Sequence, residues 1–114
     1  MKLNRVEPPR RFRVGREAHI ELRHVADVEL ESDEVVTFRS PTGSEADVTR
    51  KSWGYYWTGS LNQRLPAHGL EPVLVRGGDG KTFLMLVEAG CEREFLDYCA
   101  ENGLEPERRF ARGQ

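Results

Sequence analysis

The sequence contains little lysine, only two cysteines and no long run of apolar residues. Lys2, Lys51 and Lys81 are the only lysines among 17 basic residues, a bias that we attribute to codon usage or thermal adaptation. No apolar stretch approaches the roughly 20 residues that cross a bilayer, and the N-terminal segment MKLNRVEPPRRF lacks the apolar core of a secretory signal. We therefore expect neither a membrane span nor export, and predict a cytoplasmic protein.

The two cysteines cannot bond to each other. Cys91 and Cys99 fall in one predicted helix, where eight residues at a rise of about 1.5 Å place their Cα atoms about 12 Å apart. Their even number is thus no sign of an oxidising compartment, and reduced thiols are expected. Glu92 and Glu94 oppose a thiolate at Cys91, so both cysteines are predicted to be structural.

The histidines do not form a metal-binding pattern. His19 and His24 lie five residues apart in a predicted strand and face opposite sides, while His68 lies in a distant turn. The cysteines are not a close-spaced ligand pair either. We predict no metal site and no cofactor.

Neither the serines nor the glycine-rich loop carries a catalytic motif. Ser60 follows a glycine, but the segment lacks the second glycine of a nucleophile elbow, and a helix-capping role explains it. The loop Gly77–Thr82 resembles the end of a phosphate-binding loop, yet a strand-like apolar run follows it where a helix would be needed. No acid/base pair stands out, so we predict no catalytic residue.

Length and composition favour one folded domain with polar ends. The 114 residues suffice for a single core, and 38% hydrophobic against 32% charged residues excludes wholesale disorder. Residues 1–16 are predicted to be a basic flexible arm, residues 17–104 an α+β domain, and residues 105–114 a polar tail. The arm holds six basic residues against one acidic residue: Lys2, Arg5, Arg10, Arg11, Arg13 and Arg16 against Glu7.

Alternating hydrophobicity in the first half predicts an antiparallel meander. Residues 18–30 alternate with period two, which indicates a long half-buried strand with a bend or bulge at His24 and Val25. A second strand is expected at residues 35–39. The turn signal Pro41–Gly43 leads to a third strand, which is expected to run on from Ala46 to Trp57.

The second half predicts a short helix, a hairpin and a longer helix. Thr58, Gly59 and Ser60 offer caps for a short helix that Pro66 ends early. Residues 73–75 are expected to pair with residues 83–87 across the glycine-rich loop, and the second of these strands lacks polar alternation, which is typical of a central strand buried on both faces. A helix over residues 91–102 should cover it.

These elements predict an α+β fold. We expect a single domain with a roughly five-stranded, mostly antiparallel sheet, one short helix and one C-terminal helix packed on the sheet. The predicted core includes Ile20, Leu22, Val28, Leu30, Val36, Phe38, Val73, Val75, Phe83, Met85, Val87, Phe95 and Leu96.

The most unusual segment is aromatic and basic. Four large aromatic residues within five positions cannot all enter so small a core, and in a continuous strand Trp53, Tyr55 and Trp57 would share one face with Tyr56 on the other. Basic residues and a helix start flank them, a combination suited to an anion beside a flat apolar surface. The candidate binding residues are Arg50, Lys51, Trp53, Tyr55, Tyr56, Trp57, Ser60, Asn62 and Arg64. Packing under a helix or at a homodimer interface is the alternative.

The leading hypothesis is a non-enzymatic accessory or binding module that self-associates as a homodimer. Its aromatic and basic surface would bind a protein partner or an anionic or sugar-like small molecule. The alternative is an enzyme, or a ligand-binding enzyme subunit, acting on an anionic or sugar-bearing substrate. A second alternative, nucleic-acid binding through the basic arms, is disfavoured by a net charge of -2 and a pI near 5.9.

Overall fold

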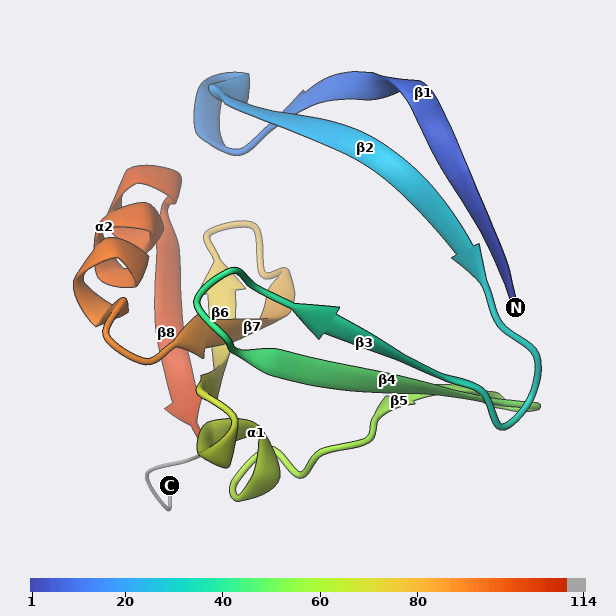
Figure 1. Cartoon of the computed structure of the whole chain (residues 1–114). Coiled ribbons are helices and arrows are strands. Elements are labelled where there is room, and N and C mark those ends of the chain that lie inside the picture. Colours follow the sequence, from blue (N-terminus) through green and yellow to red (C-terminus); the bar gives the residue numbers. More distant parts are fainter. Residues whose placement is uncertain (111–114) are drawn as a thin grey trace.

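The computed structural model describes residues 1–110 and contains three small antiparallel sheets and two helices (Figure 1). In the first sheet β1 (Lys2–Val14) pairs with β2 (Ile20–Glu29), and a 3-10 turn at Arg16–Ala18 joins them. The second sheet has the strand order β3 (Val35–Arg39), β4 (Glu45–Lys51), β5 (Gly54–Trp57). In the third sheet β6 (Leu70–Gly77) lies between β7 (Thr82–Glu88) and β8 (Leu104–Arg109). The helices are α1 (Arg64–Ala67) and α2 (Glu92–Asn102). The predicted α+β class with mostly antiparallel strands is confirmed, with eight strands in three sheets in place of about five in one.

Several local predictions are confirmed. The strand β3 has the predicted bounds, and the turn after it places Gly43 at φ 99°, a conformation that favours glycine. The glycine-rich loop joins β6 to β7 in the predicted hairpin. The helix α2 ends at Asn102, the predicted end, and Gly103 caps it in the left-handed conformation at φ 65°.

Both terminal segments differ from their expected secondary structure. Residues 2–14 were predicted as a flexible arm, but they form β1, which pairs with β2 from Lys2 opposite Glu29 to Val14 opposite Ile20. The register shifts opposite Val25, near the predicted bend, because residues 6–9 of β1 have no regular partners. Residues 104–109 form β8, so residues 105–109 of the predicted polar tail are a strand, and residues 111–114 lie outside the described range.

The pairing of β8 corrects the predicted order of the last sheet. We expected the strand at residues 83–87 to be central, but β6 is central and β7 lies at an edge, where Phe83 and Leu84 are exposed. The strand β8 takes the other side of β6, and Arg109 anchors it through ion pairs to Glu71 and Glu92. A segment of mixed charge can serve as a strand here because Arg109, at its end, meets acidic partners.

The third predicted strand is also corrected, because it folds back on itself. The chain turns at Ser52 and Trp53, so that Lys51 pairs with Gly54 and Arg50 with Tyr55. Gly54 has φ 148°, which lies in the region that favours glycine. The result is a hairpin of β4 and β5 with the aromatic residues at and after its tip.

The core is divided into two clusters. Helix α2 covers the β6–β7–β8 sheet, as predicted, and buries Phe95 and Cys99 against Val73, Val75 and Val87. Both cysteines are free thiols, Cys91 half-buried and Cys99 buried. No helix within residues 1–110 is long and apolar enough to span a membrane.

The second cluster lies where α1 meets β4 and β6. Leu65 is 2% exposed and packs with Ala46 and Leu70, and Trp57, Leu61 and Leu86 pack against them. The helix is a single turn, shorter than predicted, and Pro66 sits within it. Leu65 therefore holds a turn that has almost no helical stability of its own.

The predicted core is too large. Val73, Val75, Val87, Phe95 and Leu30 are buried, but five predicted core residues are exposed: Leu22, Val28, Phe38, Phe83 and Leu96. Each of the five lies in a segment whose apolar pattern predicts burial, yet more than a third of its side chain is exposed.

We predict that Leu65→Ala lowers the free energy of unfolding by about 2 to 5 kcal/mol, because it leaves a cavity in the second cluster. Leu96→Ala, at an exposed position of α2, removes the same atoms and should cost less than about 1 kcal/mol. Denaturant melts of both variants measure the difference. Equal losses would contradict the assignment of Leu65 to the core.

Candidate functional site

The tip of the β4–β5 hairpin carries a stacked pair of exposed aromatic rings. Trp53 and Tyr56 have ring centroids 6.0 Å apart and planes inclined by 15°. The side chains are 70% and 44% exposed. The turn at Ser52 brings the two rings together, which corrects the predicted arrangement in which Trp53 shared a face with Tyr55 and Trp57. The pair offers a flat apolar platform to solvent.

Tyr55 forms a second exposed aromatic site with its cross-strand partner. It is 61% exposed, and the guanidinium carbon of Arg50 lies 5.1 Å from its ring centroid. Arg50 Nη1 also donates a hydrogen bond of 3.1 Å to the Gly54 carbonyl oxygen. Arg50 is therefore positioned by its own hairpin, and it stiffens the turn that presents the aromatic rings.

The other predicted basic residues also have partners in the chain. Lys51 forms an ion pair with Asp33, and the hydrogen bond from Lys51 to Asp33 raises the pKa of the ammonium group. Arg64 lies 3.9 Å from Asp47. An external anion would have to compete with these carboxylates, which weakens the case for an anion subsite at the hairpin.

The remaining candidates serve the structure around α1. Trp57 is half-buried against the second core cluster, and Ser60 Oγ accepts a hydrogen bond of 2.9 Å from the Arg64 backbone nitrogen. Asn62 is exposed in the connecting turn. The expected helix N-terminus at Thr58–Ser60 is corrected: α1 begins at Arg64, and one turn of helix provides no anion site. Of the nine candidates, Trp53, Tyr55 and Tyr56 form the exposed surface, which we call the aromatic edge.

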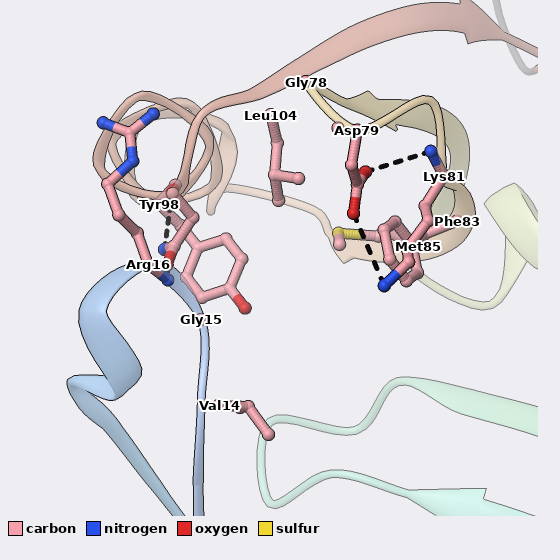
Figure 2. A pocket seen from close by; sticks show the side chains of 12 residues that line it. Val14, Gly15, Arg16, Gly78, Asp79, Lys81, Phe83, Met85, Tyr98 and Leu104 are labelled. Atoms are coloured by element: carbon pink, nitrogen blue, oxygen red, sulfur yellow. Dashed lines mark hydrogen bonds and ion pairs between the residues drawn. The ribbon is translucent and has the colours of Figure 1, made fainter.

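A cavity that sequence reasoning missed lies between the tip of the β1–β2 hairpin and the third sheet. Its volume is about 500 Å³, and its floor includes Phe83, Met85 and Leu104. Figure 2 shows the Tyr98 ring pointing into it from α2, with Asp79 and Lys81 on the opposite wall. Lys81 Nζ lies 3.4 Å from Asp79 Oδ2, so the two charges largely offset each other.

The cavity depends on contacts between distant parts of the chain. The Arg16 backbone nitrogen donates a hydrogen bond of 3.1 Å to Asn102 Oδ1, across 86 positions of sequence. The backbone N–H of Lys81 binds the Asp79 carboxylate and lowers its pKa. The glycine-rich loop, which lines the cavity, is the one local sequence feature of this site that stands out. Its sequence predicts a hairpin loop and not a cavity.

Glu88 lies in a cluster of hydroxyl groups between the second and third sheets. Ser44 Oγ donates a hydrogen bond of 2.6 Å to Glu88 Oε1, and Thr42 Oγ1 donates one of 2.9 Å to Oε2. Ser40 Oγ lies 2.8 Å from the hydroxyl oxygens of both Thr42 and Ser44. The hydroxyls of Ser40, Ser44 and Thr42 hold the pKa of Glu88 below its usual value of 4.5. The cluster has the character of a structural joint, because each carboxylate oxygen accepts a hydroxyl hydrogen bond from the turn after β3.

No metal centre or activated thiol emerges from the geometry. Residues 1–110 contain no group of three or more His, Cys, Asp and Glu side chains that could hold a metal ion. Burial raises the pKa of the Cys99 thiol, which disfavours its thiolate.

Glu88 should make stability depend on pH. Its lowered pKa in the folded state means that its contribution is complete above the unfolded value near 4.5 and is lost as the pH falls through the lower folded value. We expect the wild-type protein to lose more unfolding free energy between pH 6 and about pH 3 than Glu88→Gln does. Denaturant melts across this range measure the loss, with Glu101→Gln, an exposed glutamate of α2, as the control. Parallel curves for wild type and Glu88→Gln would contradict the role.

No protein-family model, no curated protein and no solved structure matches this chain. Its function is therefore inferred from its own residues.

Proposed function

We propose that the chain is a cytosolic, non-enzymatic binding module whose working surface is the aromatic edge, and that it binds an extended segment of a partner protein. The observation that carries the proposal is that Trp53, Tyr55 and Tyr56 are exposed on or beside an edge strand. Within the described residues, β5 pairs only with β4, so its other side offers unpaired backbone groups. An added strand would form main-chain hydrogen bonds with β5, and the aromatic side chains would pack against alternate residues of that strand.

The flatness of this surface favours a partner segment over a small ligand. Small ligands are usually held in concave sites, whereas an exposed hairpin tip offers contact area along a strand. The flanking cations are engaged by Asp33, Asp47 and the Gly54 carbonyl, which leaves the stacked rings as the main source of affinity. Trp and Tyr are enriched among residues that dominate binding energy.

A small-molecule function has a separate observation in its favour. The cavity of about 500 Å³ has an apolar floor, and Tyr98, Asn102 and Lys81 provide polar groups in its lining. These are properties of sites for drug-sized ligands. This second candidate covers the alternative of a ligand-binding enzyme subunit, with the ligand held in the cavity and not at the aromatic edge.

Nucleic-acid binding ranks last. The basic residues of β1 are partly neutralised, since Lys2 lies 3.9 Å from Glu29 and Arg11 lies 3.5 Å from Glu21. A phosphate backbone would have to displace these acids in a chain of net charge -2.

We expect Trp53→Ala to weaken binding of an extended peptide at least 10-fold while changing the unfolding free energy by less than about 0.5 kcal/mol. The probes are peptides selected from a random 12-residue display library on the wild-type protein, with affinity read by calorimetry. Phe38→Ala, an exposed aromatic of the opposite edge strand β3, is the matched control and should bind as wild type does.

N-methylation of alternate peptide amides tests the mode of binding. Strand addition requires the N–H groups that face β5, so methylation in one alternate register should abolish binding and methylation in the other should be tolerated. If no selected peptide depends on Trp53, Tyr55 or Tyr56, or if a sugar array yields the ligand of the aromatic edge, the proposal fails.

A further inference from the structure

The hairpin of β1 and β2 has an apolar face that the described part of the chain covers only in part. The cross-strand pairs Leu3 with Val28, Phe12 with Leu22, and Val14 with Ile20 fall at even positions of β2 and so share one face by alternation. We call these six residues the hairpin face. Leu3 is 56% and Leu22 42% exposed, Val14 and Val28 are exposed, and Phe12 and Ile20 are half-buried. The same face also carries Arg10 opposite His24 and Arg5 opposite Ala26 in the middle of the hairpin, so the apolar pairs lie toward its two ends. Exposed apolar pairs of this kind are typical of a face that a partner covers.

The body of the protein holds the hairpin only near its ends. No residue of β1 or β2 is buried. At one end the Arg16 backbone nitrogen bonds to Asn102, and at the other the N-terminal amine of Met1 lies 3.2 Å from Glu34. Between these ends the hairpin arches over the second sheet (Figure 1). An isolated two-stranded hairpin is marginal in water, so a further surface is needed to hold it.

The chain exposes more surface than a compact monomer of its mass, and the excess area is enough for a dimer interface. The chain exposes 8146 Å², whereas a compact monomer of 13.0 kDa exposes about 6300 Å². The four residues outside the described range do not account for this excess, since four residues of fully extended chain expose about 600 Å². An excess of about 1200 to 1800 Å² per chain corresponds to about 2400 to 3600 Å² between two chains, within the range of obligate homodimers.

The dimensions of the chain agree with its surface area. Its radius of gyration is 15.5 Å, against about 13 Å for a compact chain of 114 residues. The expansion follows from the arched hairpin, which is separated from the two core clusters.

Charge indicates where a second copy would lie. Residues 1–29 hold seven Arg and Lys against five Asp and Glu, and residues 30–114 hold ten against fourteen. The first segment is therefore net positive and the remainder net negative, so two hairpins repel each other and each is attracted to the body of the other chain. Exposed apolar residues of the body, among them Val35, Phe38 and Leu84, provide surface for the contact.

We propose that the occupant of the hairpin face is a second copy of this chain, in a two-fold dimer in which the hairpin of each copy lies on the body of the other. In a two-fold arrangement the body of each copy covers the hairpin face of the other, and the exposed apolar residues of each body are covered as well. The dimer is independent of the proposed peptide binding at the aromatic edge.

Sedimentation equilibrium tests the dimer with a pair of matched variants. We expect the wild-type protein to sediment at about 26 kDa at micromolar concentration, twice the 13.0 kDa of one chain. Leu22→Asp, which places a charge on the hairpin face, should raise the dissociation constant at least 100-fold. Val25→Asp makes the same change on the opposite face of β2, at a residue that is 55% exposed, and should remain dimeric. Trp53→Ala should also remain dimeric, which separates this proposal from the one above.

Cross-linking between isotope-labelled and unlabelled wild-type copies gives a result that does not depend on a variant folding. Carbodiimide joins neighbouring amines and carboxylates, and mixed-isotope products identify links between copies. Links from residues 1–29 of one copy to residues 30–110 of the other are expected. A wild-type protein that is monomeric at 100 μM, or a dimer whose links between copies omit residues 1–29, would overturn the proposal.

Discussion

The joint at Glu88 connects the second and third sheets of this small protein. The residue ends β7, and its carboxylate accepts hydroxyl hydrogen bonds from Thr42 and Ser44 in the turn between β3 and β4. Backbone bonds reinforce the joint on either side, from Glu45 N to His68 O and from Ala89 N to Gly69 O. The second core cluster joins the same two sheets through Ala46 of β4 and Leu70 of β6, so the polar contacts of the joint act together with apolar packing. The aromatic edge lies on the second sheet, on one side of the joint, and most residues that line the cavity lie in or beside the third sheet, on the other side.

Local sequence signals predicted the elements whose pairing is local. The strand β3, the hairpin across the glycine-rich loop and the helix α2 were all found from alternation, turn residues and capping. The backbone hydrogen bonds that form each of these elements lie within one hairpin or one helix. The α+β class followed from them.

The terminal strands were missed because their partners are distant and their composition is that of loops. In β1, Pro8 and Pro9 and five basic residues obscure the apolar alternation, and only the pairing with β2 makes it a strand. In β8, Arg109 becomes acceptable in a strand through Glu71 and Glu92, which lie far from it in sequence. The volume argument for the aromatic segment correctly required exposed rings, yet alternation assigned the wrong faces because the turn at Ser52 was not recognised. No local signal indicated the contact of Arg16 with Asn102, and so the cavity was not predicted.

The connectivity of the sheets bears on how the chain folds. In the described residues, every pair of hydrogen-bonded strands but one is consecutive in sequence, the exception being β6 with β8. Closing short loops costs little entropy, so the four hairpins can pair early. The pairing of β8 encloses β7 and α2 within its loop, and it can be completed only after β8 itself has been synthesised. During translation the hairpins can thus pair transiently as they leave the ribosome, and the third sheet is completed only when β8 joins it.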